Sequence, residues 1–224
     1  MKKVFLLAAA GLIATAGFSQ VRFGGQVIGN YGTASMEQEE SEGVKKKGVI
    51  GFGAGVVSEI ELSKSLSLRP SLNYLKKGVK LDVKAETDFG TIEGDMKVNM
   101  NFVELPVVLA YNFPLSNGKF YVGAGPSVGY GFSGKSKSTF TVSIPGFPLE
   151  TETEEVETFK KEEDGGAGFK RFDMSANVIA GIQLNNGFYV NAGGLFGLSN
   201  LGEKDSKYRN VGAQLTVGFL LNKN

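Results

Sequence analysis

The chain has 224 residues and a formal net charge of +1, and it combines 32 glycines and 17 phenylalanines with no cysteine, histidine or tryptophan. Without cysteine there is no disulfide framework, no thiolate nucleophile and no lipid-bearing N-terminal cysteine. Without histidine the commonest metal ligand and general base is missing. These absences argue against zinc chemistry and against a Ser-His-Asp site, so we expect no cofactor and no metal.

The N-terminus has the layout of a secretory signal peptide. Lys2 and Lys3 precede an apolar run over residues 4–14 and then small residues, which is the order that export signals require. Two small-x-small sites place the cut between Ala16 and Gln20. We therefore expect a signal peptide over residues 1–19. The alternative, a membrane anchor, fits less well because the apolar run is short for a spanning helix and no second one of helix length follows.

The rest of the chain, residues 20–224, is expected to form one domain, because no proline-rich or serine-rich linker divides it. Removing the two N-terminal lysines leaves 22 basic against 23 acidic residues and a net charge of −1. We therefore expect no nucleic-acid partner.

Eight stretches alternate between apolar residues and small or polar residues, with the period of two that is typical of β-strands. In chain order they cover residues 21–32, 48–62, 66–78, 101–113, 120–132, 171–183, 188–198 and 211–221. In the fifth stretch, glycine occupies nearly every second position, always on the non-apolar parity. The fourth and fifth stretches, joined by a short turn at residues 114–118, are expected to form a hairpin.

The connections between these stretches alternate in length. Residues 33–47, 82–97, 133–168 and 200–207 are expected to be polar external loops, and the third of these holds a possible protruding hairpin with Pro145 and Gly146 in its bend. The turns at 62–65, 114–118 and 185–187 are short. Short turns at one end and long loops at the other are typical of outer-membrane barrels. The pattern predicts an all-β, eight-stranded antiparallel up-and-down transmembrane β-barrel.

The residues that alternate with the apolar ones show which face of the sheet is in contact with water. A soluble, lipocalin-like barrel would carry charged residues along its exterior, whereas here these positions are rich in Gly, Ser, Asn and Gln. Small polar residues fit a narrow lumen, so we expect the apolar parity to face lipid. Nine aromatic residues fall near strand ends, as an interfacial girdle requires, although aromatic residues favour strands anywhere. They are Tyr74, Tyr111, Phe113, Phe120, Tyr130, Phe132, Phe172, Phe188 and Phe219.

Charged residues of both signs occur on the lumen parity, where an unpaired charge would be destabilising. We hypothesise a structural charge network in the lumen. Its members are Glu59, Arg69, Glu104, Arg171 and Asp173. The open alternative is that Arg171, like Glu61, lies at a strand end in contact with water. Glu104 reaches the lumen only if a bulge near Phe102 and Val103 shifts the phase of its strand, and we expect it to lie close to Arg69.

Several runs resemble the PorT-like outer-membrane β-barrel family, small porin-like barrels of Gram-negative envelopes. The most specific are Leu-Arg-Pro-Ser-Leu-x-Tyr at 68–74, Val-Glu-Leu-Pro at 103–106 and Gly-Ala-Gly-Pro at 123–126. The resemblance covers nearly all of the mature chain and implies an eight-stranded barrel in the outer membrane. Family members tend to end on an aromatic residue that the insertion machinery reads, whereas here Phe219 is followed by LLNKN. Either the last strand stops near Leu221 or recognition of this end is weaker.

No motif points to catalysis. The glycine-rich runs at 51–55 and 123–125 lie inside strands with no helix to follow, so they do not fit a phosphate loop. The acidic run at 150–164 lacks the spacing of a calcium loop. We expect a non-enzymatic barrel with a largely plugged polar lumen and external loops for contacts with surface or envelope proteins. Its other partners would be outer-membrane lipid and the barrel-insertion machinery. The alternatives are a narrow pore or passive transporter, and an enzyme acting on lipid.

Overall fold

The computed structural model describes residues 21–36, 44–87, 90–143, 149–202 and 207–221. The expected signal peptide, the expected bend at Pro145 and Gly146 and the last three residues of the C-terminal tail lie outside these ranges. No helix in the described ranges is long and apolar enough to cross a membrane.

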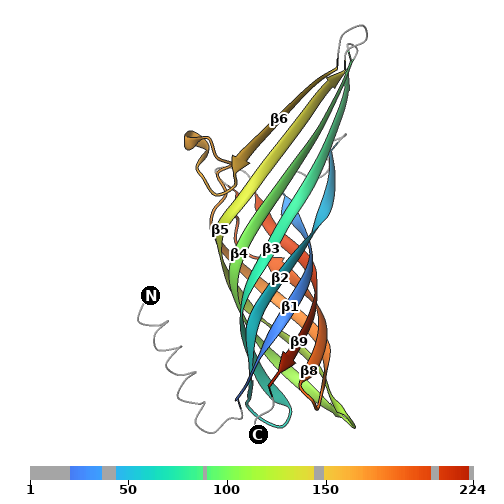
Figure 1. The fold of residues 1–224 in the computed structure, drawn as a ribbon, viewed down its shortest axis with the longest axis vertical. Coiled ribbons are helices and arrows are strands. Elements are labelled where there is room, and N and C mark those ends of the chain that lie inside the picture. Colours follow the sequence, from blue (N-terminus) through green and yellow to red (C-terminus); the bar gives the residue numbers. More distant parts are fainter. Residues whose placement is uncertain (1–20, 37–43, 88–89, 144–148, 203–206, 222–224) are drawn as a thin grey trace.

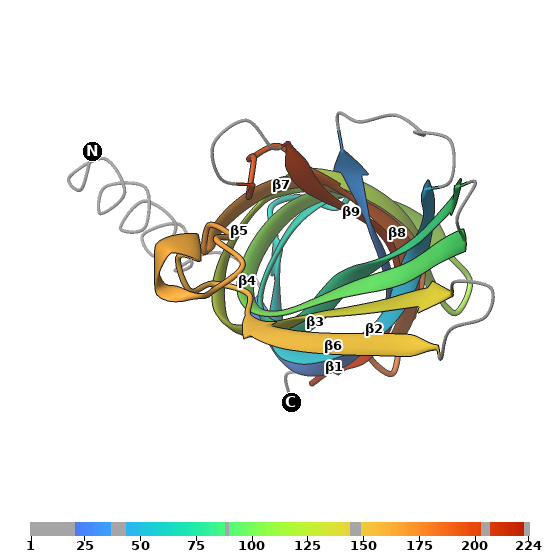
Figure 2. The same cartoon turned by 90° about the horizontal axis from the view of Figure 1, so that it is seen from above.

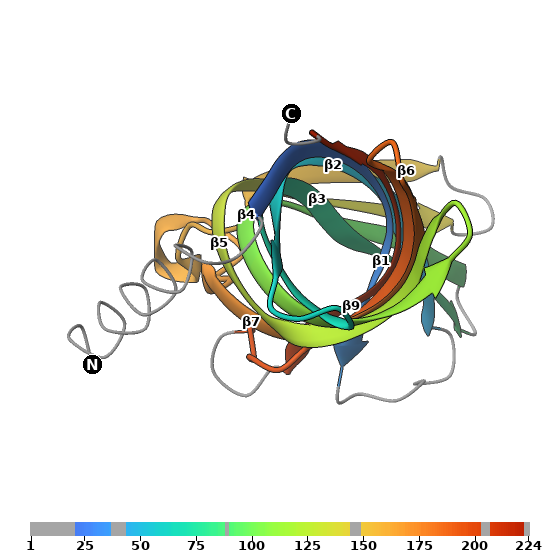
Figure 3. The same ribbon diagram turned by 90° about the horizontal axis from the view of Figure 1, so that it is seen from below.

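The described residues form nine strands and one short 3-10 helix (Figure 1). These are β1 (Val21–Met36), β2 (Val44–Glu61), β3 (Leu66–Thr87), β4 (Gly90–Leu115), β5 (Gly118–Ser143), β6 (Glu150–Glu157), η2 (Glu162–Asp164), β7 (Phe172–Leu184), β8 (Phe188–Gly197) and β9 (Tyr208–Leu220). Eight of them pair antiparallel in chain order, with β5 followed by β7, and pairing of β1 with β9 closes the ring. Seen from below, the strands form a closed ring (Figure 3). The predicted eight-stranded up-and-down barrel is confirmed.

The apolar parity faces outwards, as predicted. Large apolar side chains such as Phe52, Ile50 and Val27 are 70%, 67% and 61% exposed on the outer surface. The opposite parity is buried inside the ring although it is polar, as Asn30 and Ser71 illustrate. A barrel with polar side chains inside and apolar side chains outside is suited to a hydrocarbon solvent. Closure of the ring also pairs the strand edges that hydrocarbon could not satisfy.

Aromatic side chains mark two levels on this outer surface. The rings of Tyr111, Phe113 and Phe120 form one cluster near the short turns. At the other level Tyr74 and Phe132 lie with their ring centroids 6.1 Å apart. Phe120 and Phe132 of β5 are twelve residues apart; at about 3.3 Å per residue and a tilt of about 40° this is roughly 30 Å. The spacing matches the apolar band of a transmembrane barrel.

Above the second aromatic level the sheet continues far beyond the ring (Figure 1). The upper parts of β3, β4 and β5 stay paired up to Thr87, Gly90 and Ser143, and β6 pairs along β5 on the outside. We call this part the extension; it comprises residues 44–48, 79–87, 90–99, 133–143 and 150–157. Seen from above, it leans across one side of the barrel mouth (Figure 2).

The extension corrects two predictions. Residues 82–87 and 90–97 are not a loop but the ends of β3 and β4, and residues 44–47 belong to β2. The ends of β3 and β4 look polar because charged side chains hold one parity, yet apolar residues such as Leu81, Val83 and Met96 hold the other. The possible hairpin within 133–168 is confirmed as the β5–β6 pair.

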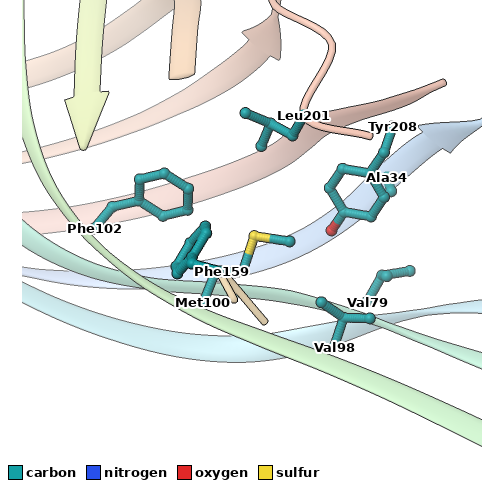
Figure 4. Close-up of a cluster of buried hydrophobic side chains, with 8 residues drawn as sticks. All are labelled: Ala34, Val79, Val98, Met100, Phe102, Phe159, Leu201 and Tyr208. Atoms are coloured by element: carbon teal, nitrogen blue, oxygen red, sulfur yellow. The ribbon is translucent and has the colours of Figure 1, made fainter. Parts of the chain in front are cut away.

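The predicted bulge exists, but on the neighbouring strand. The register between β4 and β5 shifts because Phe132 of β5 is extra, while β4 keeps one phase against β3 throughout. Met100, Phe102 and Glu104 therefore all point inwards, and all are at least 96% buried. The change of apolar parity that suggested a shift in β4 has another cause: the lumen itself becomes apolar at its outer mouth (Figure 4).

Candidate functional site

The lumen is filled by side chains in successive layers, and the layer nearest the short turns is built around Glu59. This carboxylate is fully buried and faces three cations, Arg22, Arg69 and Lys119. Arg69 Nη1 lies 3.2 Å and Lys119 Nζ 2.9 Å from Glu59 Oε1, and Gln183 Nε2 donates to Glu59 Oε2 at 3.3 Å. Several charged donors on one buried carboxylate make a tightly held group.

Two tyrosine rings complete this layer by enclosing Arg69. The guanidinium carbon lies 4.4 Å from the ring centroid of Tyr121 and 4.7 Å from that of Tyr189, which is cation–π distance on both sides. Space for one ring comes from a glycine on the neighbouring strand: Gly218 of β9 is the register partner of Tyr189, and a Cβ there would lie 2.4 Å from the Tyr189 ring. This is one reason why glycines recur on the inward parity: they accommodate large side chains from neighbouring strands.

The middle of the lumen holds one small cavity of about 60 Å³. It is lined by polar groups from several strands, including Asn73, Asn177 and Asn191, together with the Arg69 side chain. A cavity this small holds a few waters at most. Asn177 Nδ2 and Arg69 Nη2 are buried there without a hydrogen-bond partner in the described chain, and water would satisfy them.

Lys77 forms the next charged layer, towards the other end. Its ammonium pairs with Glu104 and lies 3.2 Å from Asp173 Oδ2, and all three side chains are at least 96% buried. Asp173 also accepts hydrogen bonds from Asn210 Nδ2 at 2.8 Å and Ser199 Oγ at 3.0 Å. One lysine thus neutralises two carboxylates from different strands.

An apolar cluster closes the outer mouth (Figure 4). Its buried members are Ala34, Val79, Val98, Met100, Phe102, Phe159, Leu201 and Tyr208. The ring of Phe159, which follows β6, packs edge-on against Phe102 at 5.8 Å between centroids. It occupies space over Gly131, where a Cβ would lie 2.1 Å from the ring. The segment between β6 and β7 therefore seals the lumen above Lys77.

The structure brings four of the five predicted lumen residues into ion pairs, in two groups. Arg69 meets Glu59, whereas Glu104 and Asp173 meet Lys77. The expected proximity of Glu104 to Arg69 is wrong, because the two side chains lie in different layers of the lumen.

Arg171 does not join either group. It lies at the outer mouth, where Nη1 donates to the backbone carbonyls of Gly131 and Phe132 and the guanidinium stacks 5.2 Å from the Phe159 ring. No ion pair of Arg171 occurs with another described residue. Glu61 was the other residue for which a position at a strand end, in contact with water, was the alternative. Its side chain is 36% exposed and pairs with Arg22 at the opposite end of the barrel.

Sequence reasoning missed Arg22, Lys77 and Lys119 as members of the layers. Counting alternate positions along the strands would have identified them. Arg69 and Lys77, for example, are eight residues apart on one strand and therefore face the same side. Lys77 lies inside the third predicted stretch, 66–78, on the parity of Arg69, but it was not included in the predicted network. Lys119 lies between the predicted turn at 114–118 and the predicted strand that begins at Phe120, so it was assigned to neither.

The chemistry of these layers is that of packing and charge neutralisation. Their carboxylates are buried and satisfied by cations, which leaves them out of reach of a substrate. No group of three or more His, Cys, Asp or Glu side chains that could hold a metal occurs in the part of the chain that the structure describes.

A family model described as the outer membrane protein beta-barrel domain matches residues 13–203. The chain belongs to this family. It is accordingly an outer-membrane β-barrel protein of a Gram-negative bacterium. No curated protein sequence matches it significantly.

Solved structures of other outer-membrane proteins are similar at low sequence identity. Neisserial surface protein A is 13% identical with a TM-score of 0.36, over 88% of this chain and 96% of that one. Ail, the attachment invasion locus protein of Yersinia pestis, is 15% identical with a TM-score of 0.36, over 89% and 99%. OprG from Pseudomonas aeruginosa is 10% identical with a TM-score of 0.33, over 91% and 95%.

An outer-membrane barrel has short periplasmic turns and longer external segments, which fixes the orientation of this one. The turns after β2, β4 and β7, with the Glu59 layer beside them, lie at the periplasmic end. The extension and the apolar cluster lie at the cell surface.

Proposed function

We propose that this outer-membrane barrel is non-enzymatic and non-conducting, and that its external extension contacts surface or envelope proteins. The observation that carries the proposal is the closure of the lumen at both ends. Between the Glu59 layer and the apolar cluster, the described side chains line a cavity of about 60 Å³. The alternative, a narrow pore or passive transporter, would require these layers to move apart. A larger apolar groove of about 590 Å³ beside Phe23, Pro70 and Phe219 opens towards lipid, not into the lumen.

Planar-bilayer recordings test this proposal. The wild-type barrel is expected to give no stable single-channel steps. A variant in which Arg69, Tyr121 and Tyr189 are all replaced with alanine removes the bulk of the periplasmic layer, and adding Phe102→Ala and Phe159→Ala opens the mouth. This variant is expected to conduct, provided that its boiled and unboiled forms still migrate differently on a gel. Regular steps from the wild-type protein would contradict the proposal.

The outer edge of β6 supports a role in protein contacts. In the described chain β6 pairs only with β5, so most of its other backbone edge is free to receive a strand. Glu150, Glu152 and Glu154 are exposed along it, which disfavours pairing with a like-charged strand. We infer a partner that offers an extended basic segment. A photo-reactive residue at Thr153 that yields no crosslink on intact cells would contradict this inference.

We further propose that residues 1–19 are the signal peptide, that β9 presents Phe219 to the insertion machinery, and that the chain is a PorT-like member of its family. The described strand ends at Leu220, which supports a short tail after the terminal aromatic residue. The mass of the mature protein tests the first point, since an uncleaved N-terminus would exclude it. A PorT-like structure with a different strand register around 103–106 would exclude the last.

A further inference from the structure

The outer face of the extension, which continues the lipid-facing side of the barrel upwards, carries two grooves. The distal groove, of about 1010 Å³, lies between the upper ends of β2, β3 and β4. The proximal groove, of about 580 Å³, lies next to the barrel, between β3, β4, β5 and β6. Both are lined by charged side chains, but the balance of charge differs between them.

The distal groove is largely neutralised by its own side chains, with four lysines against three carboxylates. Among the described residues, all of these except Lys45 form ion pairs, which are Lys47–Asp82 at 2.5 Å, Lys80–Asp82 at 3.3 Å, Lys80–Asp95 at 3.9 Å and Lys84–Glu93 at 3.7 Å. The hydrogen bond from Lys47 lowers the pKa of Asp82, so this carboxylate stays charged. Such a surface is satisfied without a ligand.

The proximal groove has an excess of cations. Five line it, Lys76, Lys97, Lys135, Lys137 and Arg171, against two carboxylates, Glu155 and Glu157. Of the lysines, only Lys135 forms an ion pair with another described residue, at 2.5 Å from Glu155. Lys97 and Lys137 are directly opposite each other in the β4–β5 register, and Lys137 also faces Glu155 in the β5–β6 register. Like charges opposite each other destabilise a sheet. Because Glu155 pairs with Lys135, a bound anion near Lys97 and Lys137 would reduce the repulsion that remains.

The groove begins directly above the outer aromatic level. The Tyr74 hydroxyl donates to Asn101 Oδ1 at 2.9 Å, and Asn101 Nδ2 donates to Ser133 Oγ at 3.0 Å, which marks the change from apolar to polar surface. Lys76 is two residues above Tyr74, and Lys137 is five residues above Phe132. With a rise of about 3.3 Å per residue and a tilt of about 40°, the lysines lie roughly 5 to 15 Å above this level.

We propose that the proximal groove binds the phosphorylated sugar headgroup of a glycolipid in the outer leaflet. The cations lie on the lipid-facing side, where phosphate groups of that leaflet would meet them. The headgroup layer of a simple phospholipid is only about 5 to 8 Å thick on each side, which reaches Lys76 but not Lys97 and Lys137. Phosphates carried on a sugar headgroup extend far enough to contact all three. This site is independent of any protein that the extension binds.

The test measures binding of a purified, phosphorylated lipopolysaccharide of the rough type to the full-length barrel in nonionic detergent. The variant Lys76→Gln/Lys97→Gln/Lys137→Gln is expected to bind about 100-fold more weakly, at about fivefold per lysine. The matched control Lys45→Gln/Lys46→Gln/Lys84→Gln removes three charges from the far end of the extension. It is expected to bind within about twofold of the wild type.

Three control ligands test whether the groove recognises the phosphorylated sugar headgroup. The dephosphorylated glycolipid, phosphatidylglycerol and inorganic phosphate are each expected to bind at least about tenfold more weakly than the phosphorylated glycolipid. Equal binding of phosphatidylglycerol or of inorganic phosphate would overturn the assignment to a sugar headgroup. Equal losses in the two lysine variants would overturn the location. Neither result depends on whether the lumen conducts.

Discussion

Replacing Glu59 with alanine is expected to lower the free energy of unfolding of the barrel by about 3–5 kcal/mol. Glu59 is fully buried and forms ion pairs with Arg22, Arg69 and Lys119. The substitution removes this shared carboxylate. The three cations then repel one another in a lumen with little room for water, where charge interactions are strong. Urea-induced unfolding in lipid vesicles, followed by far-ultraviolet circular dichroism, measures the change.

Glu61→Ala is the matched control for this prediction. Glu61 lies two residues further along the same strand and also pairs with Arg22, at 3.1 Å, but its side chain is 36% exposed. An exposed pair contributes about 0–1 kcal/mol, so the loss should be correspondingly small. Equal losses for Glu59→Ala and Glu61→Ala would show that the Glu59 layer does not hold the barrel together.

Replacing Lys77 with methionine is expected to destabilise the barrel by a similar amount, about 3–5 kcal/mol. Methionine preserves much of the side-chain volume, so packing changes little while the charge is lost. Glu104 and Asp173 are then left as two buried carboxylates with no cation between them. The same urea unfolding experiment applies.

A triple variant separates charge from packing at this site. Adding Glu104→Gln and Asp173→Asn to Lys77→Met removes all three charges and leaves neutral groups of the same shape. Asp173→Asn retains one oxygen that can accept the hydrogen bond from Asn210 Nδ2, while its new amide nitrogen can donate to Ser199 Oγ. At least half of the lost stability should return, which a mutant cycle reports as coupling energy. A triple variant as unstable as Lys77→Met would rule out unpaired charge as the cause.

The ring of eight strands and its inside-out polarity could be predicted from the sequence because both depend on alternation alone. Side chains two residues apart share a face, so the identity of the non-apolar parity decided which side is wet. The same logic correctly placed Arg69 and Glu59 on the lumen side. It would have placed Lys77 there as well, since Lys77 lies within the predicted third strand on the parity of Arg69.

The extension and the apolar mouth could not be read in this way, for a different physical reason. Above the membrane a strand has water on one side, so Lys80, Asp82 and Lys84 occupy a face that carries apolar residues lower down. The inner face changes in the opposite sense, from Asn73 in the lumen to Val79 at the mouth. A change of parity signals either a bulge or a change of surroundings, and only the packing of Phe159 against Phe102 distinguishes them.

The unbroken passage of β3, β4 and β5 from the barrel into the extension has a mechanical consequence. A domain joined by a loop would swivel, but this sheet has no hinge at the membrane surface, since its backbone pairing continues through the Phe132 bulge. A pull on the tip along the strands therefore loads many backbone hydrogen bonds in shear at once. The barrel and the extension therefore form one rigid unit, which holds the upper ends of the strands at a fixed height and angle above the cell surface.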